Sequence, residues 1–183
     1  AVYTEVTDEA LAAFLQQNDI GHAVAFRGIA EGVENSNFSL RTSGGDFILT
    51  LYEKRVNPEE LPWFLGLMEH LARRGLTCPQ PVRGRDGQAL RQLAGRHAAI
   101  TTFLPGVWPR RVRPEHCGPL GAALAQLHLA GEGYAATRTN ALGPHGWAPL
   151  LDRARASMAG AAVEPHIPAL CDEIGTALEA TLA

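Results

Sequence analysis

The stretch from residue 37 to residue 52 restricts the possible folds more than any other part of this chain. Its two halves, NFSLRT and DFILTLY, place apolar side chains at every second position, which is the period of a strand with one buried face. Between them lies Ser43-Gly44-Gly45, where glycine can adopt the positive φ of a tight turn. The sequence therefore predicts an antiparallel hairpin. One face, with Phe47, Leu49 and Leu51, packs on a core, and the other, with Ile48 and Thr50, is available to line a site.

Helices and further strands are predicted around this hairpin. A helix over 8–17 begins after Thr7, a typical capping residue, and a second helix follows Asn57-Pro58 and ends before Gly75. The predicted buried stripe of the second helix comprises Leu61, Phe64, Leu65, Met68, Leu71 and Ala72. Additional strands are expected over 22–29, 80–83 with 90–93, and 97–104. The pattern predicts an α+β fold, with a helix packed on an antiparallel sheet of about five strands.

The composition and the hydrophobic periodicity of the chain change near Pro105-Gly106. Short alternating runs broken by glycines precede this point, and Ala- and Leu-rich segments with helical spacing follow it. Helices are expected over 115–130, 147–158 and 167–182. We therefore predict a sheet-containing lobe over 1–104, a hinge or linker over 105–113, and the start of a mostly helical lobe over 114–183.

Composition excludes several classes of protein. The 183 residues carry a net charge of −3, whereas general nucleic-acid binders show a basic excess. The three cysteines, Cys78, Cys117 and Cys171, are far apart and lack metal-ligand spacing, which is typical of reduced thiols in a cytosolic protein. The first residues are acidic and polar, and no apolar run reaches the roughly 18 residues of a membrane span. We expect a cytoplasmic protein without membrane or nucleic-acid partners.

The segment from Gly28 to Asn37, GIAEGVENSN, is a glycine-bearing turn between two predicted strands. Backbone N–H groups of such a turn can approach phosphate oxygens closely because glycine has no side chain. The segment lacks the Walker A pattern, and a strand rather than a helix follows it, which also excludes a dinucleotide-binding fingerprint. A plain hairpin loop is the alternative interpretation.

Five phrases of the chain resemble one known family. They are GIAEGVENSNF (28–38), FILTLYEKR (47–55), LPWFLGLMEHLARRGLTCPQPV (61–82), TFLPGVWPR (102–110) and LGAALAQLHLA (120–130). Together they resemble the bacterial homoserine kinase branch of the aminoglycoside-phosphotransferase-like superfamily, whose fold is related to that of protein kinases. The resemblance runs from the first residues to the region of Trp147 and weakens after Ser157.

The resemblance implies transfer of the γ-phosphoryl group of ATP, with Mg²⁺, to the hydroxyl of L-homoserine, a small hydroxylated amino acid of threonine biosynthesis. Residues 1–104 would then cover ATP. Gly28, Gly32 and Asn35 would shape the phosphate loop, with Val33 over the base or ribose. Ile48 or Thr50 would line the roof of the pocket, and Thr102-Phe103-Leu104 would offer hinge hydrogen bonds to adenine. Phe103 is equally well explained as strand core.

The chain also departs from the family pattern. Thr50 stands where a kinase-like lysine is expected, which leaves Lys54 or Arg55 as candidate phosphate cations, and Glu60 and Glu69 are explained by the helix dipole and an exposed face. None of the seven histidines begins an H-x-D-x-x-x-x-N catalytic loop. We therefore expect that the chain stops before the catalytic loop, so that it contributes no catalytic residue or metal ligand and is inactive alone.

Two alternatives remain open from the sequence. A choline-kinase-like or aminoglycoside-kinase-like acceptor is possible within the same superfamily. A non-catalytic nucleotide-binding module is possible outside it, because the catalytic loop is missing. The leucines near residues 120–127 and 170–178 further predict exposed apolar surface and self-association.

Overall fold

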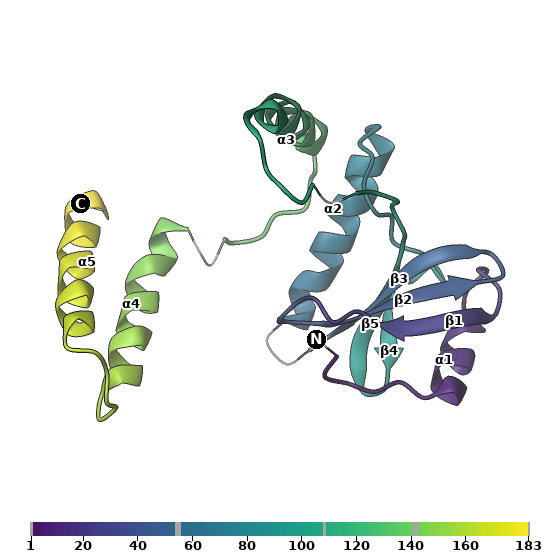
Figure 1. The fold of residues 1–183 in the computed structure, drawn as a ribbon, viewed down its shortest axis with the longest axis horizontal. Helices are drawn as coiled ribbons and strands as arrows, with labels where there is room; N and C mark the ends of the chain where they lie inside the picture. Colours follow the sequence, from purple (N-terminus) through teal and green to yellow (C-terminus); the bar gives the residue numbers. More distant parts are fainter. Residues whose placement is uncertain (1, 54–55, 108, 141–142, 183) are drawn as a thin grey trace. The chain divides into compact units, whose positions relative to one another are not determined.

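The computed structural model describes residues 2–53, 56–107, 109–140 and 143–182. The chain forms two compact units, Ala1–Thr137 and Arg138–Ala183. Figure 1 shows the sheet within the first unit and a pair of helices in the second. The sequence analysis divided the chain into lobes at residues 104 and 113, whereas these compact units meet at residue 137. The lobe boundaries stay a prediction.

A five-stranded antiparallel sheet organises the first unit, in the order β1-β2-β3-β5-β4. The strands are β1 (Ala23–Gly28), β2 (Ser36–Thr42), β3 (Gly45–Tyr52), β4 (Leu90–Leu93) and β5 (Arg96–Thr102). The predicted hairpin is confirmed, since β2 pairs with β3 from Ser36↔Leu51 to Thr42↔Gly45. The α+β fold class predicted from the sequence is therefore correct.

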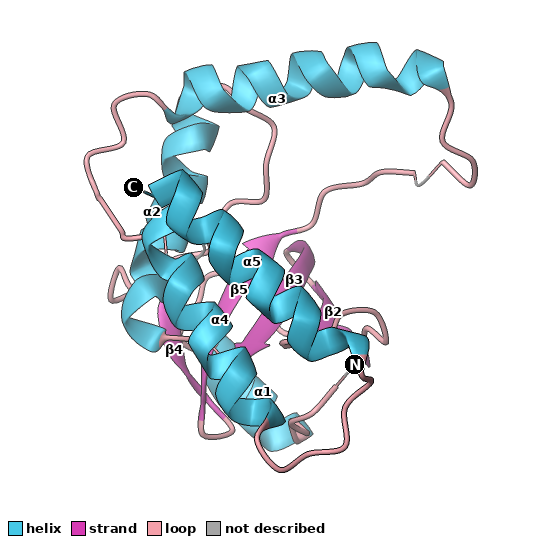
Figure 2. Cartoon of the chain, turned by 90° about the vertical axis from the view of Figure 1, so that its left-hand side faces the viewer, coloured by secondary structure: helices cyan, strands magenta, loops and turns pink. Residues whose placement is uncertain are grey.

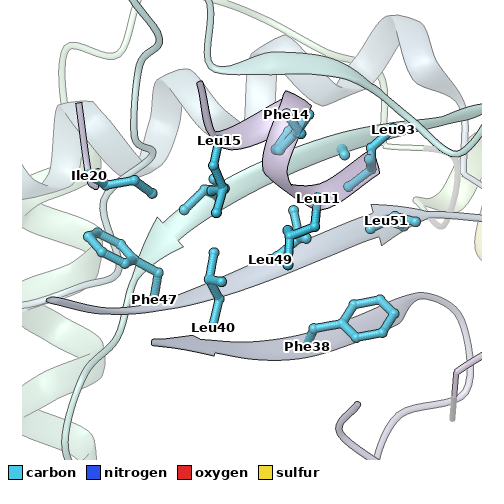
Figure 3. Close-up of a cluster of buried hydrophobic side chains, with 12 residues drawn as sticks. Leu11, Phe14, Leu15, Ile20, Phe38, Leu40, Phe47, Leu49, Leu51 and Leu93 are labelled. Carbon is cyan, nitrogen blue, oxygen red and sulfur yellow. The ribbon is translucent and has the colours of Figure 1, made fainter. Parts of the chain in front are cut away.

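One face of the sheet carries the core. Helix α1 (Asp8–Leu15) lies against it, and the Thr7 side chain caps this helix by accepting a hydrogen bond from the Ala10 N–H at 3.2 Å. Figure 3 shows Leu11, Phe14 and Leu15 of the helix above Leu40, Phe47, Leu49 and Leu51 of the sheet. Leu40, Leu49 and Leu51 are fully buried, as their alternation predicted.

The second helix is largely as predicted. The Asn57 side chain caps a short 3₁₀ turn (Pro58–Glu60), which leads into α2 (Leu61–Arg73), and Gly75 follows with φ of +85°. Leu61, Leu65 and Leu71 are buried, but Phe64 remains 40% exposed, so the predicted stripe is wrong at this position. Its ring instead packs edge-on against Trp63, at 5.1 Å between centroids.

Two strand predictions need correction. Residues 80–83 form no strand and contribute only an isolated bridge, Pro81↔Thr101. The segment still hydrogen-bonds to β5, from the Val82 N–H to the Ile100 carbonyl at 2.8 Å and from the Thr102 N–H to the Gln80 carbonyl at 2.9 Å, but this pairing is too short to form a strand. The last strand ends at Thr102 rather than at residue 104. Strand β4 pairs with β5 instead, through a turn in which Ala94 and Gly95 both have positive φ.

Helices make up most of the remaining chain. A 3₁₀ turn (Pro114–His116) leads into α3 (Cys117–Gly131), on which Leu120, Leu124 and Leu127 are exposed. In the second unit, α4 (Pro144–Met158) and α5 (His166–Leu182) run side by side, as Figure 2 shows. Leu151 and Cys171 are buried within this pair. No described helix combines the length and apolar character of a membrane span.

The β2–β3 turn provides a test of the fold. A Cβ atom at Gly44 would lie 2.6 Å from the Ile20 carbonyl oxygen, which is backbone and cannot swing away. We expect Gly44→Ala to lower the free energy of unfolding by about 1–3 kcal/mol in urea denaturation. Gly106→Ala is the matched control, because nothing lies within 4 Å of its added Cβ. That variant should stay within about 1 kcal/mol of wild type, and equal losses in both variants would contradict the prediction.

Candidate functional site

The face of the sheet opposite the core carries mostly polar side chains. Directly paired residues of antiparallel strands share a face, and residues two apart on one strand do so as well. The register Arg27↔Ser39, Ser39↔Ile48 and Ile48↔Thr101 therefore identifies this open face. It comprises Ala25, Arg27, Asn37, Ser39, Arg41, Asp46, Ile48, Thr50 and Thr101. The sequence prediction that Ile48 and Thr50 face away from the core agrees with this register.

The predicted glycine loop, residues 29–35, connects β1 to β2 at one end of the open face. The Ile29 N–H donates to the Asn37 carbonyl at 2.8 Å and closes the base of the loop. Gly32 has φ of +102°, a conformation that a side chain would strain. Val33, at 79% exposure, lies toward solvent. The loop is thus anchored at its base and exposed at its apex, a geometry compatible with backbone N–H groups that meet an anion.

Two side-chain hydrogen bonds fasten the exit of the loop, one between β2 and β3 and one between the loop and the residue that follows β3. The Thr50 hydroxyl donates to Asn37 Oδ1 at 2.8 Å, across the Asn37↔Thr50 pair. The Asn35 Oδ1 accepts from the Glu53 N–H at 3.3 Å. Asn35 therefore shapes the loop through its side chain. The Thr50 hydroxyl stands where a kinase-like lysine was expected, and its hydrogen-bond partner is Asn37.

The predicted hinge lies at the opposite end of the open face. The Thr102 N–H donates to the Gln80 carbonyl at 2.9 Å, and the Phe103 N–H donates to the Asp46 carbonyl at 3.2 Å. Phe103 is 47% exposed, so strand core does not describe it. Within the described ranges, Leu104 is the hinge residue whose N–H makes no hydrogen bond to the rest of the chain. Its N–H is therefore available to an acceptor on a ligand.

A cavity of about 350 Å³ opens on this face near the hinge, lined by Ala25, Phe26, Arg27, Ser39, Arg41 and Asp46. Arg41 donates to Asp46 at 2.8 Å in a solvent-exposed ion pair. Arg27 makes no ion pair in the described part of the chain. The sequence analysis missed Arg27. The signal that could have identified it is the alternation along β1, which directs Arg27 to the face opposite that of its half-buried neighbour Phe26.

Other charged residues proposed from the sequence have different roles. Glu69 forms a two-point ion pair with Arg83, with both contacts at 2.7 Å, and its side chain is 18% exposed. It is a half-buried structural partner of Arg83, so its assignment to an exposed helix face was wrong. Lys54 and Arg55, the candidate phosphate cations, lie outside the described residues. Among the described residues, no cluster of His, Cys, Asp or Glu could hold a metal ion.

A second cavity, of about 840 Å³, lies elsewhere, between α1 and β1. Its lining includes Leu11, Asn18 and His22, and none of the site residues predicted from the sequence. The two cavities share Ala25 and Phe26 in their linings, and neither lining includes a site residue predicted from the sequence. Of the predicted residues, Ile48 and Thr50 lie on the open face.

A buried polar network supports the glycine loop from the core side. Ser36, fully buried at the start of β2, donates from its hydroxyl to Glu53 Oε1 at 2.6 Å. Arg96 lies 2.9 Å from Glu53 Oε2, and the Glu53 side chain is only 9% exposed. Burial by itself would raise the pKa of Glu53, but hydrogen bonds from Ser36 and Thr4 and the charge of Arg96 together lower it. The sequence offered no signal for this network.

Comparisons with known proteins identify the family of this chain. Residues 25–183 match the model of the phosphotransferase enzyme family, so the chain belongs to that family. Curated homoserine kinases are similar to it: the sequence from Granulibacter bethesdensis is 69% identical over 182 residues, and that from Acidiphilium cryptum is 71% identical over 183 residues. Both matches cover all of this chain and 56% of the relative, so the chain spans little more than half the length of these enzymes.

A solved structure supports the fold. The crystal structure of spectinomycin phosphotransferase in complex with ADP and spectinomycin superposes with a TM-score of 0.59 at 12% identity. The superposition covers 93% of this chain and 53% of that one. At this identity the likeness concerns the fold alone, and it confirms the expected phosphotransferase architecture.

The Glu53 network generates a prediction for stability. We expect Glu53→Gln to lower the free energy of unfolding by about 1–3 kcal/mol near pH 7, because the replacement leaves Arg96 without its carboxylate. The folded-state pKa of Glu53 lies below its value in the unfolded chain, about 4.3. The contribution of the carboxylate is therefore present above that value and is lost as the pH falls through the folded-state pKa.

The measurement is urea denaturation of wild type and variant between pH 7 and pH 3. The stability difference should stay constant near neutral pH and shrink below about pH 4. Glu5→Gln, at an exposed glutamate of the N-terminal segment, is the control and should show neither effect. A difference that persists unchanged at pH 3 would show that the Glu53 charge is not responsible.

Proposed function

We propose that this chain provides the ATP-covering part of a homoserine kinase, an enzyme that transfers the γ-phosphoryl group of ATP to the hydroxyl of L-homoserine. The observation that carries the proposal is the open sheet face, which places the glycine loop at one end and the hinge at the other. The family match and the relatives at 69–71% identity support the reaction and the acceptor.

The spacing on the open face suits an extended nucleotide. Asp46 contacts the hinge, and Thr50 contacts Asn37 below the glycine loop. Thr50 lies four positions after Asp46 on β3, which corresponds to about 13 Å at the rise of a β-strand. Adenine would accept a hydrogen bond from the Leu104 N–H, and the phosphates would lie beneath the loop around Gly28 and Gly32. Ile48 would then contribute apolar surface between the two ends.

Phosphoryl transfer depends mainly on positioning and on stabilisation of charge. In this chain the glycine loop would orient the phosphates through its N–H groups. Asn35 would hold the loop to the Glu53 N–H, and Thr50 would hold β2 beside β3 at the loop exit. Magnesium would neutralise phosphate charge when bound, and we expect its ligands outside the described residues. Arg27 would add positive charge from β1, because Thr50 occupies the position expected for a lysine.

The acceptor and the compartment belong to the same proposal. Choline or an aminoglycoside is the alternative acceptor within the family, and nucleotide binding without catalysis is the alternative function. The identity to homoserine kinases favours L-homoserine over both. A cytoplasmic location is part of the proposal and is supported by the free thiols of Cys78, Cys117 and Cys171.

An ATP-consumption assay decides the function. The sample for this assay is a protein that contains residues 1–183 and is as long as its homoserine kinase relatives. We expect turnover with L-homoserine and at least a hundredfold lower kcat/KM with choline or spectinomycin, since an acceptor site built for one polar ligand discriminates strongly. ATP binding without turnover of any acceptor would favour the non-catalytic alternative.

Arg27 provides a second test of the nucleotide site. We expect Arg27→Gln in the same protein to raise KM for ATP about tenfold, because a guanidinium–phosphate contact contributes roughly 1.5–3 kcal/mol. KM for L-homoserine should be unchanged. Arg85→Gln is the matched control, since Arg85 forms an exposed ion pair with Asp19 beside the other cavity. Equal effects of the two variants on KM for ATP would argue against a nucleotide on the open face.

A further inference from the structure

We propose that Tyr3 is a positioning residue for the glycine loop, which the N-terminal residues Val2, Tyr3 and Thr4 hold from behind. This N-terminal strap contacts the loop at its entry, its apex and its exit. The inference deepens the proposed function, since it rests on the glycine loop being the part of the site that covers phosphate.

The first contact is at the entry to the loop. A Cβ atom at Gly28 would lie 2.7 Å from Val2 Cγ2, so the valine side chain occupies the space that a larger residue at position 28 would need. Glycine at position 28 therefore has two reasons: a larger residue would displace the exposed Val2 side chain of the strap, and it would obstruct the close approach of a phosphate to the backbone. The sequence suggested only the second reason.

The second and third contacts are hydrogen bonds. The Tyr3 hydroxyl donates to the Val33 carbonyl at the exposed apex of the loop, at 3.0 Å. The backbone N–H groups of Tyr3 and Thr4 donate to the Ser36 hydroxyl oxygen at 2.8 and 3.2 Å. Ser36 is fully buried and itself bonded to Glu53, so the strap is fastened to an immobile point at the loop exit.

The strap lies on the side of the loop that is away from the open face. Gly28 pairs with Phe38, whose side chain belongs to the core, and Ser36 pairs with Leu51, which also faces the core. The open face, where the nucleotide would lie, therefore stays free. A loop fixed from behind presents its N–H groups to phosphate without the entropy cost of ordering them on binding.

Tyr3→Phe removes only the hydroxyl that reaches the loop apex. Tyr134→Phe is the matched control, because the Tyr134 hydroxyl donates to the Trp63 carbonyl at 2.7 Å, on α2. Glu31 and Glu34 lie in the loop and are exposed, so a glutamate-specific protease reports how often the loop opens. Mass spectrometry separates cleavage at these two sites from cleavage elsewhere.

We expect Tyr3→Phe to accelerate cleavage after Glu31 and Glu34 about three- to tenfold, the factor that corresponds to one ordinary hydrogen bond. The dissociation constant for ATP, measured by calorimetry, should rise by a similar factor with little change in melting temperature. Tyr134→Phe should change the melting temperature and leave both loop readouts at wild-type values.

The outcomes separate this inference from the proposed function. Unchanged loop cleavage in Tyr3→Phe overturns the strap, whatever the protein binds. Faster cleavage with an unchanged ATP dissociation constant overturns the positioning role. If the wild-type protein fails to bind ATP, the proposed function fails, and the positioning role fails with it. Equal effects of Tyr3→Phe and Tyr134→Phe on both readouts would reduce Tyr3 to a general contributor to stability.

Discussion

The burial of one face of β3 determines most of what this chain can do. Leu49 and Leu51 are fully buried between β2 and β5, and Ile100 on β5 is 2% exposed. Because side chains alternate along a strand, burial of this set directs every intervening residue to the opposite face. A register slip of one residue would bury the polar set in the core. The hydrophobic core thus positions the candidate site without contacting it.

Buried groups also position the glycine loop. The loop is exposed, yet both ends are held: the Val2 side chain of the strap lies against Gly28, and the buried Ser36 donates to the nearly buried Glu53. Glu53 retains its charge in a nearly buried position because Ser36, Thr4 and Arg96 surround it. Polar groups in such surroundings need partners, which makes their geometry specific. An exposed loop can therefore hold one conformation while its apex stays accessible.

The electrostatics of the open face differ from the pattern expected for the family. A hydroxyl, that of Thr50, stands where a cation was expected, and it is bonded to Asn37. Glu69 on α2 pairs with Arg83 instead of a strand residue. Positive charge on this face comes from β1 and β2, through Arg27 and Arg41, and the Arg41 charge is shared with Asp46.

The sequence alone determined the local elements: the β2–β3 hairpin by its alternation, α1 by its Thr7 cap, and the start of the second helical segment by Asn57-Pro58. These features are local because neighbouring residues decide strand period, turn conformation and capping. Tertiary structure decided the rest. Residues 80–83 pair with β5 through a single bridge rather than as a strand. Arg27 lies on the open face because of the register of β1, and the Tyr3 hydroxyl bonds to the Val33 carbonyl 30 positions away in the sequence. Such contacts depend on the closing of the sheet and on burial, which no local pattern encodes.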